Sequence, residues 1–166
     1  MSVRLQIMQA LTAELAAIAP SAYTNTLAGR VYRGKPAFCY EQHGFAFVTM
    51  LEPSDLREIL PAPGFPDRRA GDWRLLLYGV TAGAGDHDNP TDAAYLLLED
   101  LQKCIAAINK AGRVAGRTPR PLGGLVTGPI EQGRGVVLAP DKDDARPTAI
   151  CVLPLDIPLT ENLEKL

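Results

Sequence analysis

Hydrophobic residues recur along this chain at two different spacings, which separate helices from strands. Spacings of three and four residues, typical of a helix with one buried face, run through residues 2–19. The same spacing returns after Asn89, where the apolar stripe consists of Ala94, Leu97, Leu98, Leu101, Ile105 and Ile108. We therefore predict two amphipathic helices, the second of which ends near Lys110 and Gly112.

Capping residues support both helices. Ser2 is a suitable N-cap for the first helix, and Pro20 follows its end. Asn89 is placed to cap the second helix, with Pro90 in the first turn and Asp92 three residues after the cap. We expect the Ser2 and Asn89 side chains to accept hydrogen bonds from backbone N–H groups that an uncapped helix leaves without partners.

Short apolar runs predict the strands. Residues 45–51 are apolar on both faces, which is typical of a central strand, and residues 73–82 read as a buried strand. Val31 and Tyr32 begin a further short strand between two glycines. The last third predicts three more strands, at 124–130, 135–138 and 148–159.

Two details qualify the last third. A turn at Gln132 and Gly133 separates the first two of its strands. Pro154 and Pro158 cannot donate backbone hydrogen bonds, so we expect their end of the last strand at a sheet edge. Residues 160–166 are expected to form a loose tail.

This order of elements predicts a single α+β domain covering residues 1–166. We expect a two-layer sandwich in which both helices pack on one face of a mixed, mostly antiparallel sheet. Residues 54–72 interrupt the pattern as a long extended arm, and connections of that length are usually functional or mobile. A disordered crossing is the alternative interpretation of this arm.

Composition excludes several classes of protein. Hydrophobic residues make up 46% and charged residues 22% of the chain, which is ordinary for a folded domain. A net charge of -2 provides no general field for binding nucleic acid or an anionic membrane. No apolar run is long enough to cross a membrane, and the N-terminus lacks the continuous apolar centre of a secretion signal. We therefore expect a soluble protein made in the cytoplasm.

Enzyme-like motifs are weak. Gly83 and Gly85 follow a strand and precede a helix, as in a dinucleotide-binding corner, but Asp88 then places a carboxylate where a pyrophosphate would bind. Asp86, His87 and Asp88 could ligate a metal only with help from elsewhere in the chain. Acids such as Glu99 and Asp100 fit a solvated helix face.

No reactive cysteine or serine motif appears either. Cys39, Cys104 and Cys151 form no Cys-x-x-Cys pair, so we expect reduced structural thiols rather than zinc ligands or a redox pair. The chain also lacks a Gly-x-Ser-x-Gly nucleophile motif. We predict a protein without catalytic residues, cofactor or metal.

The arrangement as a whole resembles that of the tail terminator proteins of long-tailed bacteriophages, the family that includes the minor tail protein U of phage lambda. The resemblance covers nearly the whole chain. Its segments are the helix at 2–19, Gly29-Arg-Val-Tyr-Arg33, the strand at 45–51 with the arm that follows, Trp73-Arg-Leu-Leu-Leu-Tyr-Gly-Val80, the helix start at 88–100, Gly133-Arg134 and the strand at 149–157.

The resemblance implies a structural virion protein. It implies a ring, typically hexameric, that caps the tail tube, stops its polymerisation and presents the surface for head attachment. Its partners would be other copies of the chain, the tail tube protein and a head–tail connector, with DNA only passing through the lumen. The ring would be assembled in the host cytoplasm and would sit at the head-proximal end of the tail.

Two segments of opposite charge are candidate subunit contacts for such a ring. The arm carries Arg57, Phe65, Arg68 and Arg69, and an acidic loop carries Asp141, Asp143 and Asp144. We expect the two segments to meet between neighbouring subunits. Two alternatives stay open: another phage head–tail adaptor or tail-completion protein, and a small metal-dependent enzyme that uses Asp86, His87 and Asp88.

Overall fold

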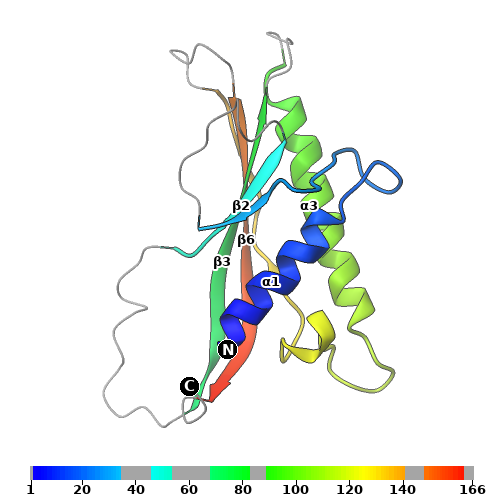
Figure 1. The fold of residues 1–166 in the computed structure, drawn as a ribbon, viewed down its shortest axis with the longest axis vertical. Helices are drawn as coiled ribbons and strands as arrows, with labels where there is room; N and C mark the ends of the chain where they lie inside the picture. Colours follow the sequence, from blue (N-terminus) through cyan, green and yellow to red (C-terminus); the bar gives the residue numbers. More distant parts are fainter. Residues whose placement is uncertain (1, 35–45, 54–67, 83–88, 141–147, 163–166) are drawn as a thin grey trace.

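A mixed β-sheet with two helices on one face forms the described part of the chain (Figure 1). The computed structural model describes residues 2–34, 46–53, 68–82, 89–140 and 148–162. The elements are α1 (Val3–Ala16), β1 (Val31–Arg33), β2 (Phe47–Leu51), β3 (Arg68–Ala82), α3 (Asp92–Ala111), the 3-10 turn η2 (Leu122–Gly124), β4 (Glu131–Gln132), β5 (Val136–Leu138) and β6 (Thr148–Asn162).

The strand order across the sheet is β1-β2-β3-β6-β4, and β5 also pairs with β6. Only the β1–β2 pair is parallel, and every other pair in the described sheet is antiparallel. The predicted α+β class, with a mixed and mostly antiparallel sheet, is therefore confirmed. β3 and β6 are its spine, since they pair along their full 15 residues from Arg68↔Asn162 to Ala82↔Thr148.

The core lies between the sheet and the helices. Alternate side chains of β3 and β6 point toward the helices, because successive residues of a strand face opposite sides. The buried residues on this side are Trp73, Leu75, Leu77, Leu153, Leu155 and Ile157 from the strands, with Ile7, Leu11, Leu15, Leu97, Leu101 and Ile105 from the helices. In β2, Phe47 to Met50 are all buried, as its predicted central position requires.

Gly79 allows α3 to approach the centre of the sheet closely. A Cβ atom at this position would lie 2.6 Å from Cys151 Sγ and 2.7 Å from Leu97 Cδ2. Both distances are too short for carbon, so any side chain here would push helix and sheet apart. The glycine thus sets the spacing of the two layers at this point.

Two predicted boundaries are wrong at the far end of the spine. Residues 68–72 belong to β3 rather than to the arm, and residues 160–162 belong to β6 rather than to a loose tail. The two extensions pair with each other, beginning at Arg68↔Asn162 and Arg69↔Glu161. Neither extension has an alternating apolar pattern, so each becomes a strand only through a partner about 90 residues away in the sequence.

The strand predicted at 124–130 is also wrong. This segment follows the η2 turn, in which Leu122, Gly123 and Gly124 all have positive φ angles, a geometry incompatible with a strand. The adjacent β4 occupies Glu131–Gln132, where we expected a turn. Asn109 of α3 holds the intervening Ile130, because its side chain accepts from the Ile130 N–H at 2.9 Å and donates to the Ile130 carbonyl at 2.8 Å.

β6 is an inner strand of the sheet, but Pro154 and Pro158 fall outside the residues that pair with β4 or β5. It lies between β3 on one side and β4 and β5 on the other. The carbonyls of Pro154 and Pro158 accept hydrogen bonds from the N–H groups of Gly133 and Thr127. Because the N and C=O of one strand residue point to the same side, the proline nitrogens also face away from β3. The prolines therefore leave the β3–β6 ladder intact.

The helix starts differ slightly from the prediction. Thr91, not Asn89, occupies the N-cap position of α3, and Asp92 is its first helical residue. Neither Thr91 nor Ser2, which precedes α1, makes a side-chain capping bond. The predicted first helix of residues 2–19 ends earlier than expected, at Ala16.

Candidate interaction surface

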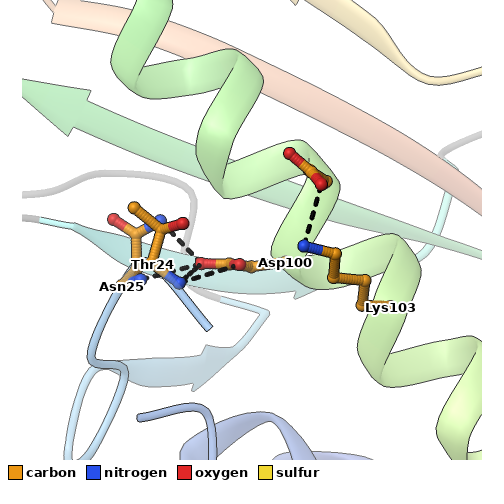
Figure 2. Close-up of polar contacts among 5 residues, drawn as sticks. Thr24, Asn25, Asp100 and Lys103 are labelled. Atoms are coloured by element: carbon orange, nitrogen blue, oxygen red, sulfur yellow. Dashed lines mark hydrogen bonds and ion pairs between the residues drawn. The ribbon is translucent and has the colours of Figure 1, made fainter. Parts of the chain in front are cut away.

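Asp100 of α3 holds the connection between α1 and β1 (Figure 2). Its carboxylate is fully buried and accepts hydrogen bonds from the backbone N–H of Thr24 at 3.0 Å, which reaches both oxygens, and from the backbone N–H of Asn25 at 2.8 Å. The Asn25 side-chain amide adds a bond at 2.9 Å. The expectation that Asp100 lies on a solvated helix face is wrong, because this loop folds over it.

Glu99 does lie on the exposed side of α3. It forms an ion pair with Lys103, one helical turn later, at 2.8 Å, and both side chains are more than half exposed. The hydrogen bond that Lys103 donates to the Glu99 carboxylate holds the pKa of Lys103 above its usual value. Adjacent acids of one helix thus have opposite roles: Asp100 fixes the fold, and Glu99 belongs to the surface.

The first candidate surface, which we call the α1 edge surface, lies beside the edge strand β1. It is a shallow groove of about 640 Å³ lined by Ser2, Arg4, Leu5, Met8, Gln9, Arg33 and Glu52. Leu5 is 44% exposed, whereas Ile7, Leu11 and Leu15 of the same helix are buried. Arg33 is exposed at the end of β1.

Arg4 anchors this surface to the sheet. Its guanidinium lies 3.7 Å from a Glu52 carboxylate oxygen and 5.4 Å from the centre of the Trp73 ring. Trp73 Nε1 donates to the same Glu52 oxygen at 3.2 Å. The three side chains therefore link the start of α1 to β3 next to Leu5.

The second candidate surface, the α3 edge surface, lies on the first half of α3. It is a shallow groove of about 500 Å³ lined by Asp92, Tyr95, Leu96, Leu98, Glu99 and Gln102. Tyr95 is 58% exposed and Leu96 is 43% exposed. The groove faces the β4–β5 side of the sheet, because Gln132 Nε2 donates to the Gln102 carbonyl and Leu98 packs against Gly135.

These two surfaces lie at opposite edges of the sheet, because β1 ends the strand order on one side and β4 and β5 end it on the other. They differ in charge. The α1 edge surface contains two arginines and one glutamate, whereas the charged residues lining the α3 edge surface are Asp92 and Glu99. Each edge thus combines exposed apolar side chains with charges of predominantly one sign.

A third cleft lies between the ends of both helices and η2, with a volume of about 480 Å³. It contains Glu14, Tyr23, Cys104 and Arg120. Burial raises the pKa of the Cys104 thiol to about 11, so the thiol stays protonated and unreactive at neutral pH. Burial also raises the pKa of Tyr23.

Most of the interface residues predicted from the sequence lie outside the described residues, namely Arg57, Phe65, Asp141, Asp143 and Asp144. The same is true of Asp86, His87 and Asp88, the proposed metal ligands. Arg68 and Arg69 lie in β3 and pair with Asn162 and Glu161 of β6. The contact between the basic arm and the acidic loop stays a prediction.

Within the described ranges, no group of three or more His, Cys, Asp and Glu side chains is arranged to hold a metal ion. None of the helices described is long and apolar enough to span a membrane. No protein-family model matches the chain, and no curated protein matches it.

Sequence reasoning missed the two edge surfaces, although a signal for one was present. Tyr95 and Leu96 are large apolar residues that fall outside the buried stripe of their helix. Residues outside the stripe point away from the core, so their exposure could have been predicted. Leu5 gave no comparable signal, because it falls among the apolar residues assigned to the buried face of the first helix. Its exposure depends on where β1 and β2 lie beneath α1.

Proposed function

We propose that this chain is a phage tail terminator, a structural protein that assembles as a ring on the end of the tail tube. In this role it stops tube polymerisation and provides the surface for head attachment. It makes and breaks no covalent bond. It is a component of the virion, and its partners are further copies of the chain, the tail tube protein and a head–tail connector.

One observation carries the proposal: exposed apolar side chains lie at both edges of one sheet, beside basic residues at one edge and acidic residues at the other. A ring of identical subunits requires two unlike surfaces, each of which meets the other on a neighbour. Leu5 at one edge and Tyr95 with Leu96 at the other meet that requirement. The β3–β6 spine and the Asp100 contacts supply the rigidity that a cap needs.

The test is a tube-growth assay. The purified chain is added to the polymerising tail tube protein of the same phage, and tube lengths and tube ends are measured by negative-stain electron microscopy. A terminator shortens the tubes and leaves a ring at one end. Tubes of unchanged length with bare ends would refute the proposal. A ring bound to the portal instead of the tube would identify a head–tail adaptor.

A further inference from the structure

We propose that the α1 edge surface of one copy docks into the α3 edge surface of the next copy. The inference rests on the proposed function, since it names the faces through which a ring would close. It differs from the predicted contact between arm and acidic loop, because it uses only described side chains. The occupant of each groove is therefore a second copy of this chain.

The apolar parts of the two surfaces are complementary. Leu5, with Met8 one turn later, gives the shallow α1 groove an apolar lining, and Leu5 is 44% exposed. Tyr95, Leu96 and Leu98 give the shallow α3 groove an apolar lining as well, and Tyr95 and Leu96 are largely exposed. Packing the exposed side chains of each surface against the other removes apolar area from water on both copies, which is the usual driving force for association of helices.

The charges are complementary as well. Asp92 and Glu99 surround the apolar groove on α3, and Asp92 lies in the first turn of its helix. Arg4 already contacts Glu52 and Trp73, and Glu99 is already paired with Lys103. Arg33 and Asp92 are therefore the two charges best placed to meet across the contact between copies. Opposite charges at the rim of an interface fix its register and speed association, and like charges disfavour other pairings.

The positions of the two surfaces determine the kind of assembly. Because they lie at opposite edges of the sheet, one copy cannot use both surfaces against the same partner. Each copy instead uses one surface toward the preceding copy and the other toward the following copy. Such a head-to-tail contact generates a closed ring or an open filament, and not a symmetric dimer.

The test uses one variant of each surface. Leu5→Glu places a charge on the α1 edge surface, and Tyr95→Glu places one on the α3 edge surface. Both side chains are largely exposed, so we expect both variants to fold. Val114→Glu is the matched control, because Val114 is 59% exposed but lines neither surface. Circular dichroism confirms folding, and analytical ultracentrifugation over a concentration series measures assembly.

Wild type and the Val114→Glu control are expected to form species larger than a monomer, and each edge variant alone is expected to be monomeric. A one-to-one mixture of the two edge variants is the decisive sample. The Leu5→Glu copy retains an intact α3 surface and the Tyr95→Glu copy an intact α1 surface, so the mixture forms one interface per pair. It should therefore give a dimer that grows no further.

Charge exchange tests the register. Arg33→Asp should weaken association by roughly tenfold, in line with the loss of a close interfacial charge pair. Adding Asp92→Lys to the same chain should recover most of the lost affinity. Every interface then carries an acidic residue at position 33 opposite a basic residue at position 92. Restoration would not follow if either residue acted only within its own subunit.

Three outcomes would overturn the inference: a wild type that stays monomeric at the highest concentration, edge variants that assemble like wild type, or a mixture that remains monomeric while wild type assembles. The proposed function fails separately. A chain whose edge variants pair as described but which leaves tube length unchanged would refute the terminator role alone. Edge variants that cap tubes as well as wild type would refute the docking contact alone.

Discussion

Replacing Asp100 by Ala should strongly lower the free energy of unfolding of this protein, even though the substitution also removes the cost of burying a charge. Asp100 is fully buried and accepts bonds from two backbone N–H groups and one side-chain amide, at 2.8–3.0 Å. Burying a carboxylate is costly in itself, and an alanine avoids that cost. The three donors remain, however, and lose their common acceptor.

The magnitude follows from how well water can replace the carboxylate. Hydrogen bonds to a charged acceptor contribute about 1.5–3 kcal/mol each, and an orphaned buried donor costs a similar amount. Thr24 is exposed and Asn25 is half-buried, so water can reach part of the site. We therefore expect a loss of roughly 2–4 kcal/mol in the free energy of unfolding, less than the sum of the bonds.

Thermal and urea unfolding measure this loss. For a domain of this size, each kcal/mol shifts Tm by about 2–4 °C, so Asp100→Ala should lower Tm by roughly 5–15 °C. The Tm of Asp100→Asn should fall between those of wild type and Asp100→Ala. The asparagine oxygen still accepts a hydrogen bond, but its NH2 group meets an N–H donor where the carboxylate had offered an acceptor. Glu99→Ala is the matched control, since the neighbouring side chain is exposed, and its Tm should stay close to that of wild type.

Hydrogen exchange localises the effect. The amides of Thr24 and Asn25 should lose protection in Asp100→Ala, while amides in the β3–β6 ladder keep theirs at temperatures well below Tm. Equal Tm values for Asp100→Ala and Glu99→Ala, within about 1 °C, would refute the view that this carboxylate holds the loop.

Three further predictions concern the sheet and the thiols. Gly79→Ala should lower the free energy of unfolding by about 1–3 kcal/mol through overpacking, and adding Cys151→Ala to the same chain should recover part of that loss. A double-mutant cycle in urea measures this coupling, and effects of the two substitutions that simply add would contradict the contact. Burial raises the pKa of the Cys104 thiol to about 11 and that of the Cys151 thiol to about 12. Both thiols should therefore resist labelling by iodoacetamide at pH 8 until urea unfolds the chain, which peptide mass spectrometry measures. Rapid labelling of either thiol in the native state would count against this prediction. The hydrogen bond that Arg74 donates to Asp156 lowers the pKa of this carboxyl group. The pair therefore stabilises the fold at pH values above the ordinary carboxyl pKa, and this stabilisation is lost as the pH falls through the lowered pKa. Arg74→Ala should reduce the urea midpoint at pH 7 but not near pH 2, and an equal reduction at both pH values would disprove the prediction.

Sequence patterns determined the elements that carry strong local signals. The stripe at Ala94, Leu97, Leu101, Ile105 and Ile108 specified α3, because a spacing of three and four residues buries one helix face wherever the helix packs. The run at residues 45–51, which is apolar on both faces, specified β2 as a central strand. From these elements the α+β class with two helices on one face could be predicted, since both apolar helix faces require a sheet to cover them.

Only the tertiary structure decided the features that depend on contacts distant in the sequence. Residues 68–72 and 160–162 became strands because they pair with each other, although neither segment has a strand pattern of its own. Asp100 and Glu99 look alike in the sequence, and only the loop at Thr24 and Asn25 buries one and leaves the other exposed. The same holds for Leu5 on the α1 edge surface. Local sequence sets the backbone preference of each segment, but burial and charge environment depend on which distant segments pack against it, and these determine where another subunit can bind.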